Sequence, residues 1–369
     1  MIFNFFNFFN FFNFSLQGKG CLYNYLVFQY EYFKSSVDFK LCVDFKIICD
    51  SSFTLNKTFC KVVKDKNVSY KITDCGEFFW FIGDEFVYMD GGDSLSKISK
   101  IQFSENFPKM QASMIIDSIM RFRLGRFDIS LVHAAAVSKN GKGVLIPAWK
   151  GMGKTALTIK LLKSGYEYLA DDRVWVSSRG SIYSYPRYVV LKDSNYHYFP
   201  DFMTLIIRVK YRLTKAISLV EWRFSGANLL RKVLYRVFKV KARHFHVQKL
   251  LPDIVVASRA NLNFTFILYR ESVEEPSIQP QEVSSVLMAI DSINNYEWDT
   301  DLLKLCAARD LLLNSHASWK KEFFQLLNND KVSLDKAFCT SMCFKAVVPK
   351  NPVENDFDEI VERMDEICK

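Results

Sequence analysis

Residues suited to binding and transferring phosphate lie close together in one stretch of the chain, residues 131–176. A glycine-rich run, AWKGMGKT, extends from Ala148 to Thr155, and Asp171 and Asp172 follow sixteen residues after the threonine. Consecutive backbone N–H groups in such a run, together with the N-terminus of a following helix, bind anionic oxygens. The stretch therefore predicts a site for the phosphates of a nucleotide.

The glycine-rich run resembles a phosphate loop (Walker A motif) in its second half, GxGK[ST], with the first glycine replaced. Glycines let the backbone curl and approach the phosphates, the lysine reaches the β- and γ-phosphates, and the threonine hydroxyl coordinates Mg²⁺. Bulky Trp149 and Lys150 follow the replaced position, which argues against tight nucleotide binding. The expected phosphate-binding residues are Ala148, Lys150, Gly151, Met152, Gly153, Lys154 and Thr155.

The acid pair Asp171-Asp172 supplies the groups that phosphoryl transfer still needs. One carboxylate can hold the metal, and the other can accept the proton of an acceptor hydroxyl. Adjacent side chains on a strand point to opposite faces, so the two acids should differ in role. An Asp-Asp pair alone is more often a solvated turn, but its position one short strand after the loop helix favours a catalytic interpretation.

A strand must lead into this loop and a helix must follow it. Asn140-Gly141 is a strong hairpin signal because both positions tolerate positive φ. The predicted elements are strands at 129–138 and 143–147 joined by a turn at 139–142, a helix at 155–163, and strands at 166–170 and 173–177.

Strands alternate with helices after residue 128, which indicates an α/β (α+β) core over residues 105–369. Residues 19–104 contain short aromatic runs between turn signals and predict a mainly-β accessory or docking domain. The strands expected there are 23–30, 39–49, 78–82 and 86–89. The remaining predicted elements are helices at 105–125, 281–294, 299–327 and 357–367, and strands at 264–269 and 344–348.

The chain of 369 residues is 49% apolar and 24% charged, the balance of a folded protein, and its net charge is +9. Residues 201–250 hold twelve basic and two acidic residues, a net +10, with apolar residues at helical spacing. We predict a basic helical insertion at about 201–255. A basic amphipathic helix can contact a membrane surface, nucleic acid or an acidic protein. A solvated insertion packed on the core is the equally open alternative.

The N-terminal run MIFNFFNFFNFFNF carries Asn at every third position and is too interrupted for a membrane helix. It is interpreted as a low-complexity extension over residues 1–18, with a weak interfacial anchor as the alternative. The nine cysteines show no regular bridge spacing and no CxxC pair. We expect mostly buried thiols and a cytoplasmic location.

Several segments together resemble the HPr kinase/phosphorylase family, and more closely the HPr kinase-related proteins, within the fold group shared with phosphoenolpyruvate carboxykinases. The segments are His133–Val137, Gly143–Pro147, the glycine-rich loop, Leu161–Tyr166, Ala170–Val174 and Tyr185–Lys192. A short distance from phosphate loop to acid pair is typical of that group. The resemblance is good over about 130–192, faint at 264–270 and 344–367, and absent in the N-terminal third.

The resemblance implies that Lys154 and Thr155 bind phosphate and Mg²⁺ and that Asp171 is the general base. It implies that Asp172 is a metal-side or orienting carboxylate and that His133 lies near the phosphates; a lone histidine beside alanines is otherwise more often structural. The family's second glycine-rich signature is missing after the acid pair. The resemblance therefore does not favour HPr as the substrate or imply phosphorylase activity.

These observations lead to the expectation of an ATP-dependent kinase that phosphorylates a hydroxyl of a protein, a peptide or a small molecule. One alternative is a non-catalytic nucleotide-binding regulatory protein, motivated by the Ala148-Trp149-Lys150 departure. Another is an interaction protein that uses the basic 201–250 segment on an acidic partner or a membrane. A homo-oligomer stays open. Phosphoenolpyruvate carboxykinase chemistry is least favoured, since no second metal-binding constellation occurs.

Overall fold

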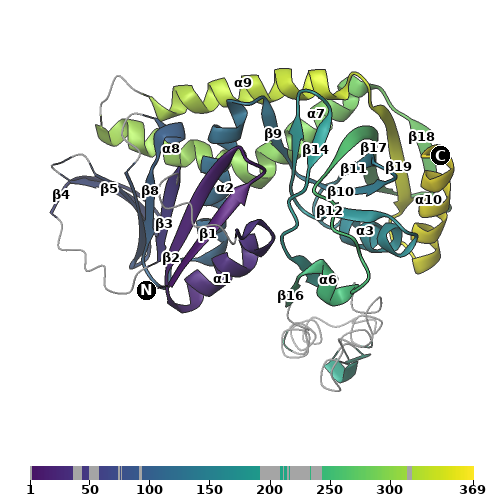
Figure 1. Cartoon of the computed structure of the whole chain (residues 1–369), viewed down its shortest axis with the longest axis horizontal. Helices are drawn as coiled ribbons and strands as arrows, with labels where there is room; N and C mark the ends of the chain where they lie inside the picture. Colours follow the sequence, from purple (N-terminus) through teal and green to yellow (C-terminus); the bar gives the residue numbers. More distant parts are fainter. Residues whose placement is uncertain are drawn as a thin grey trace, which may run out of the picture.

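The computed structural model shows a mixed α/β protein built on two large sheets, as the sequence predicted (Figure 1). In Figure 1 the N-terminal sheet lies on the left and the second sheet on the right, with helix α9 (Trp319–Phe338) along the top of both. The structure describes residues 2–35, 44–49, 58–73, 75, 77–90, 94–191, 208–210, 212, 213, 216, 233, 243–313 and 318–369.

The N-terminal sheet has the strand order β1-β2-β3-β8-β7-β6-β5-β4, with β3 parallel to both of its neighbours and the other pairs antiparallel. The strands are β1 (Ile2–Phe8), β2 (Phe12–Gly18), β3 (Phe45–Cys49), β4 (Phe59–Asp65), β5 (Val68–Thr73), β6 (Phe78–Ile82), β7 (Glu85–Met89) and β8 (Lys100–Phe103). The helical elements of this part are α1 (Gly20–Tyr30), η1 (Glu31–Phe33), η2 (Leu95–Lys97) and α2 (Lys109–Gly125). The strands predicted at 78–82 and 86–89 are confirmed as β6 and β7.

The N-terminal Phe/Asn run forms a hairpin of β1 and β2 that is part of the sheet, with Phe6 opposite Phe14. The side chains of Phe6, Phe8, Phe12 and Phe14 are buried, in the two-residue period of a strand with one buried face. The structure thus differs from the expected extension. The sequence shows Asn at every third position, which obscures the two-residue alternation of buried Phe. The turn at Phe9-Asn10 separates the two strands, and the alternation begins again after it.

Residues 23–30 belong to helix α1, so the strand predicted there is wrong. Leu22, Leu26 and Tyr30 are all buried and recur every four residues, which is helical spacing. The high content of aromatic residues favoured a strand prediction, but burial of one helical face decides the conformation. The helix predicted at 105–125 is confirmed as α2.

The second sheet has the order β12-β10-β11-β17-β14-β13-β9, and β19 and β18 extend it beside β17. Strand β11 runs parallel to β17, and β17 runs parallel to β19. The strands are β9 (Ile129–Val132), β10 (Ala134–Lys139), β11 (Lys142–Pro147), β12 (Glu167–Ala170), β13 (Val174–Ser177), β14 (Ser181–Tyr183), β17 (Arg259–Glu271), β18 (Ser277–Pro280) and β19 (Met342–Pro349).

The predicted hairpin at Asn140-Gly141 joins β10 and β11, and both turn residues have positive φ, 53° and 77°. The strand expected over 129–138 is interrupted at His133. Strand β9 before it pairs with β13, whereas β10 after it pairs with β11. The histidine therefore lies at a junction between strands.

Helices cover both faces of the second sheet (Figure 1). Side chains of β10 alternate between the two: Ala135 and Val137 pack with helices α3 and α10, and Ala134 and Ala136 belong to the opposite core. The helix predicted at 299–327 is two helices, α8 and α9. The helical elements of this part are α3 (Lys154–Lys163), α6 (Val247–Leu250), α7 (Val283–Asn294), the π-helical turn η5 (Asn295–Asp299), α8 (Thr300–Leu313), α9 and α10 (Glu354–Ile367).

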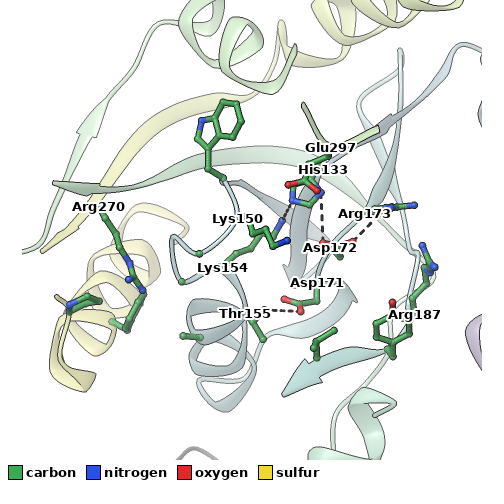
Figure 2. Close-up of a pocket in the computed structure, with 18 of the residues that line it drawn as sticks. His133, Lys150, Lys154, Thr155, Asp171, Asp172, Arg173, Arg187, Arg270 and Glu297 are labelled. Carbon is green, nitrogen blue, oxygen red and sulfur yellow. Dashed lines mark hydrogen bonds and ion pairs between the residues drawn. The ribbon is translucent and has the colours of Figure 1, made fainter. Parts of the chain in front are cut away.

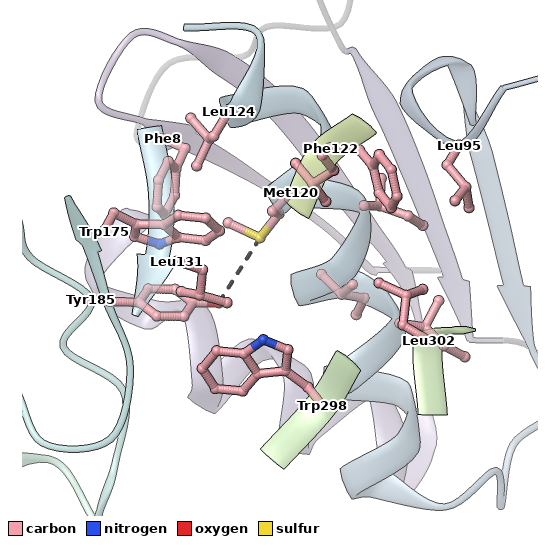
Figure 3. Packing of buried hydrophobic residues seen from close by; sticks show 14 of the residues in the cluster. Phe8, Leu95, Met120, Phe122, Leu124, Leu131, Trp175, Tyr185, Trp298 and Leu302 are labelled. Atoms are coloured by element: carbon pink, nitrogen blue, oxygen red, sulfur yellow. Dashed lines mark hydrogen bonds between the residues drawn. The ribbon is translucent and has the colours of Figure 1, made fainter. Parts of the chain in front are cut away.

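One hydrophobic core joins the two sheets. Figure 3 shows Phe8 of the N-terminal hairpin against Trp175 and Tyr185 of the second part, with ring centroids 5.8 and 6.0 Å away. Helix α8 also packs on β4 and β5. The domain boundary between residues 104 and 105 stays a prediction.

A buried ion cluster lies in the same interior. The guanidinium of Arg121 on α2 donates from Nε to Asp330 at 2.9 Å and also pairs with Asp299. Burial raises the pKa of both carboxyl groups, while the arginine opposes that shift.

Most of the basic 201–250 segment falls outside the described residues, so the predicted helical insertion there stays a prediction. The nearest described strands on either side of it, β15 (Val189–Leu191) and β16 (Arg243–Phe245), pair with each other. Among the eight cysteines of the described part, Cys49, Cys306 and Cys343 are buried and Cys21, Cys60, Cys75 and Cys339 are exposed, so the expectation of mostly buried thiols is wrong. In the described residues, no helix combines the length and apolarity required to span a bilayer.

Candidate active site

The glycine-rich loop connects β11 to α3, as the motif requires, and its two glycines have left-handed backbone conformations. Gly151 has φ +89° and Gly153 has φ +105°. A Cβ atom at Gly153 would lie 2.6 Å from Cζ of Phe357 on α10, so this position needs glycine for both conformation and space. Ala148, which replaces the first glycine, is fully buried in the core beneath α3.

A cavity of about 620 Å³ opens over this loop and contains most of the predicted site (Figure 2). Ala148 and Met152 do not line it: Ala148 is buried, and Met152 contributes its backbone carbonyl as an acceptor for Arg270 Nε at 3.1 Å. The predicted residues that line the cavity are His133, Lys150, Gly151, Gly153, Lys154, Thr155, Asp171 and Asp172.

The two acids have different partners, although both lie beyond the end of β12 at Ala170 and not on the strand itself. The Thr155 hydroxyl donates to Oδ2 of Asp171 at 3.0 Å. Asp172 instead faces the opposite wall, with its Oδ1 3.7 Å from His133 Nδ1 and its Oδ2 3.5 Å from Arg173 Nε. The resemblance implied that Asp172 is the metal-side or orienting carboxylate, whereas the acid that contacts the threonine is Asp171.

His133 is held rigidly at the strand junction. Its backbone N–H donates to the side-chain oxygen of Asn294 at 3.0 Å, and the Asn294 amide donates to the Leu131 carbonyl at 3.2 Å. Lys154 Nζ lies 2.8 Å from His133 Nε2. Because an ammonium only donates, Nε2 must be the acceptor, which assigns the ring proton to Nδ1 on the Asp172 side.

Burial and the neighbouring Lys154 lower the pKa of His133 to about 3, so the ring is neutral at physiological pH. Burial also lowers the pKa of Lys154, although Asp172 and Asp171 oppose that shift. Desolvation disfavours the charged form of Asp172, but the positive charges of Lys154 and Arg173 hold its pKa well below the ordinary value. The cavity thus presents an ionised carboxylate beside a neutral imidazole.

Two arginines beside Asp172 are fixed by a buried acid on α2. Asp117 pairs with Arg173 and accepts from Arg187 Nη1 at 2.8 Å, and the Tyr185 hydroxyl donates to its other oxygen at 2.6 Å. Arg187 also donates from Nε to Gln29 of α1 at 2.6 Å. The N-terminal part of the chain therefore helps to build this wall of the cavity.

The sequence reasoning named neither these arginines as site residues nor Glu297 and Arg270, which also line the cavity. Arg270 directly follows the predicted strand 264–269, so a charge at the end of an apolar strand was an available signal. No comparable signal in the sequence marked Glu297 on η5. The lining carries five cations (Lys150, Lys154, Arg173, Arg187 and Arg270) and three acids (Asp171, Asp172 and Glu297), a net charge of +2 with His133 neutral.

The described residues contain no cluster of three or more His, Cys, Asp or Glu side chains that could hold a metal ion by themselves. A metal at this site would therefore need oxygens from a bound ligand. The hard oxygen donors nearest the start of α3 are the Thr155 hydroxyl and the Asp171 carboxylate.

Comparison with known proteins gives limited similarity. No family model matches the chain. A 67-residue segment is 36% identical to the HPr kinase/phosphorylase of Lactiplantibacillus plantarum, an alignment that includes 18% of this chain and 21% of that protein. The match thus spans about a fifth of the relative's length. It suggests a relation of this chain to HPr kinase/phosphorylase, in agreement with the segments around the glycine-rich loop.

Proposed function

We propose that this protein is a Mg²⁺·ATP-dependent kinase that phosphorylates a hydroxyl group. The observation that carries the proposal is the hydrogen bond from Thr155 to Asp171 at the start of α3, with Lys154 and Asp172 facing the same cavity. These are the positioning and charge-stabilising groups that phosphoryl transfer requires. The partial similarity to HPr kinase/phosphorylase supports a kinase-like activity.

The residues present fit a nucleoside triphosphate with Mg²⁺. The net positive lining suits a polyanion, and the glycine-rich loop leaves its backbone open to phosphate oxygens. The Thr155 hydroxyl and the Asp171 carboxylate would hold Mg²⁺, which prefers few protein ligands plus phosphate oxygens and water. When bound, the ion neutralises charge on the β- and γ-phosphates.

Asp172 is the proposed acceptor of the proton from the substrate hydroxyl. The acceptor oxygen bonds to the γ-phosphorus, the bond from that phosphorus to ADP breaks, and the hydroxyl proton passes to the Asp172 carboxylate. Its low pKa keeps it ionised and ready to orient the hydroxyl. A weak base suffices because a loose transition state depends mainly on positioning. Neutral His133 keeps Lys154 in place without adding charge.

The acceptor would enter from the end of the cavity beyond Asp172. Tyr25 of α1, Met110 and Ser113 of α2, and Arg187 and Tyr188 also line the cavity. Helix α1 precedes the nucleotide core in sequence, so the N-terminal part would take a share in acceptor binding. The acceptor is a hydroxyl of a protein, a peptide or a small molecule.

Calorimetric titration of Mg²⁺·ATP into wild type, Lys154→Ala and Asp172→Asn tests the proposal. We expect Lys154→Ala to weaken binding by about tenfold or more, because charge-assisted hydrogen bonds to phosphate are lost. Asp172→Asn should bind ATP but lose transfer of radiolabelled γ-phosphate to components of a cell extract. Lys163→Ala, at the other end of α3, is the matched control and should change neither.

Two results would decide against a kinase. If wild type does not bind Mg²⁺·ATP, the whole proposal fails. If it binds ATP but labels nothing in the extract, and Asp172→Asn behaves like wild type, a nucleotide-binding regulatory protein becomes the better interpretation.

A further inference from the structure

Lys150 adds a second ammonium to the glycine-rich loop, at a position that the motif leaves open. It stands four residues before Lys154, at the start of the curled segment. Its side chain lines the cavity, and Figure 2 shows it directed into the space beside Lys154 and His133. Two lysines from opposite ends of one loop therefore converge on the same space.

No hydrogen bond or ion pair engages Lys150 within the described part of the chain, and the residue is exposed. The other lining cations are held by the protein. Lys154 bonds to His133, Arg173 and Arg187 share Asp117, and Arg270 bonds to the loop carbonyl of Met152. Lys150 is thus the lining cation that stays available for a ligand. Its charge reaches the proposed reaction centre, because it contributes to the lowered pKa of His133, after burial, Lys154 and Arg173.

The side on which Lys150 lies decides which phosphate it would meet. In a phosphate loop the backbone N–H groups surround the inner phosphates, and the lysine directly before the Ser or Thr, here Lys154, reaches outward to the β- and γ-phosphates. Lys150 lies on the His133 side, and His133 Nδ1 faces Asp172, the proposed proton acceptor. The terminal phosphate must lie next to that acceptor for transfer to occur.

We propose that Lys150 contacts the terminal phosphate of a bound nucleoside triphosphate and makes the site discriminate triphosphate from diphosphate. The inference rests on the proposed nucleotide site. A triphosphate carries one more phosphate charge than a diphosphate, and Lys150 meets that additional charge. Before transfer it strengthens binding of the donor, and after transfer ADP loses this contact and dissociates more easily.

Calorimetric titrations with two ligands test this directly: the Mg²⁺ complex of a non-hydrolysable ATP analogue, and Mg²⁺·ADP. Lys150→Met keeps most of the side-chain length and removes the charge, so the affinity of the variant for the analogue should fall by about tenfold, the scale of one lost phosphate contact. Its affinity for ADP should change by less than about twofold. Lys150→Arg should keep most of the preference, and Lys163→Met on the far end of α3 should change neither affinity.

The possible outcomes separate this inference from the proposed function. If wild type binds both ligands but Lys150→Met weakens them equally, Lys150 acts on the inner phosphates or on the loop, and the inference is wrong. If Lys150→Met changes neither affinity, Lys150 is a solvated loop residue, and the inference is equally wrong. If wild type binds neither ligand, the nucleotide site itself is refuted. An unchanged melting temperature of each variant shows that it is folded.

Discussion

Lowering the pH should destabilise the protein through the buried imidazole of His133. Burial and Lys154 lower its pKa to about 3, whereas an imidazole in an unfolded chain titrates near 6.5. Between these values the unfolded chain binds a proton that the folded chain does not. The contribution of neutral His133 to the free energy of unfolding is therefore fully present above about pH 6.5 and decreases as the pH falls toward 3.

The size of the effect follows from the two pKa values. Each unit of difference corresponds to about 1.4 kcal/mol, so crossing the window from 6.5 to about 3 costs up to about 5 kcal/mol. At pH 5 the cost is already about 2 kcal/mol. Against a typical folding free energy of about 5–15 kcal/mol, that loss is easily measured.

Urea unfolding of wild type and His133→Gln at pH 7, 6 and 5 provides the assay. A glutamine oxygen can accept the hydrogen bond from Lys154 but does not titrate. We expect wild type to lose about 2 kcal/mol more than the variant between pH 7 and pH 5. His244 and His246 are present in both proteins, so their titration cancels in the comparison. If the two proteins lose stability in parallel, His133 is not the buried neutral group that its surroundings indicate.

Three further experiments test other parts of the structure. Arg121→Met should lower the free energy of unfolding at pH 7 by about 3–5 kcal/mol in urea unfolding, because two buried carboxylates lose their cation. The loss should become smaller toward pH 4, where these acids take up protons, and a loss that stays the same would contradict this cause. Gly153→Ala should weaken nucleotide binding more than Gly151→Ala, because an added Cβ clashes with Phe357 at Gly153 and meets nothing at Gly151. Equal effects of the two variants in the ATP titration would refute this prediction. Phe14→Ala should cost about 3–5 kcal/mol, as for other buried phenylalanines, and an unchanged urea midpoint would show that the N-terminal hairpin does not stabilise the fold.

The strand, loop and helix around the glycine-rich run could be predicted because their signals are local. Asn140-Gly141 specifies its own turn, and the glycines at 151 and 153 have the positive φ that their residue type permits. The short distance from Thr155 to Asp171 placed both beside the same helix start. In each case the residues that determine the geometry are near one another in sequence.

The remainder of the site depends on contacts between distant segments. Asn294, which fixes the His133 backbone, is 161 residues away in sequence, and Arg187 is 158 residues from Gln29. No spacing rule connects such pairs, because the folded sheets and helices bring them together. The strand predicted at 23–30 failed for a related reason, since burial against the rest of the protein selected a helix there.

Asp117 has a consequence for how this chain can be divided. It collects two arginines of the cavity wall and also accepts a hydrogen bond from Tyr30 of α1 at 3.3 Å. A truncated chain beginning at residue 105 would retain the loop and both acids, yet leave Arg187 without Gln29 and the hydrophobic core without its first two strands. The smallest unit that forms the complete cavity should therefore be larger than the segment that carries the glycine-rich loop, and changes in the N-terminal third should alter the proposed acceptor end of that cavity.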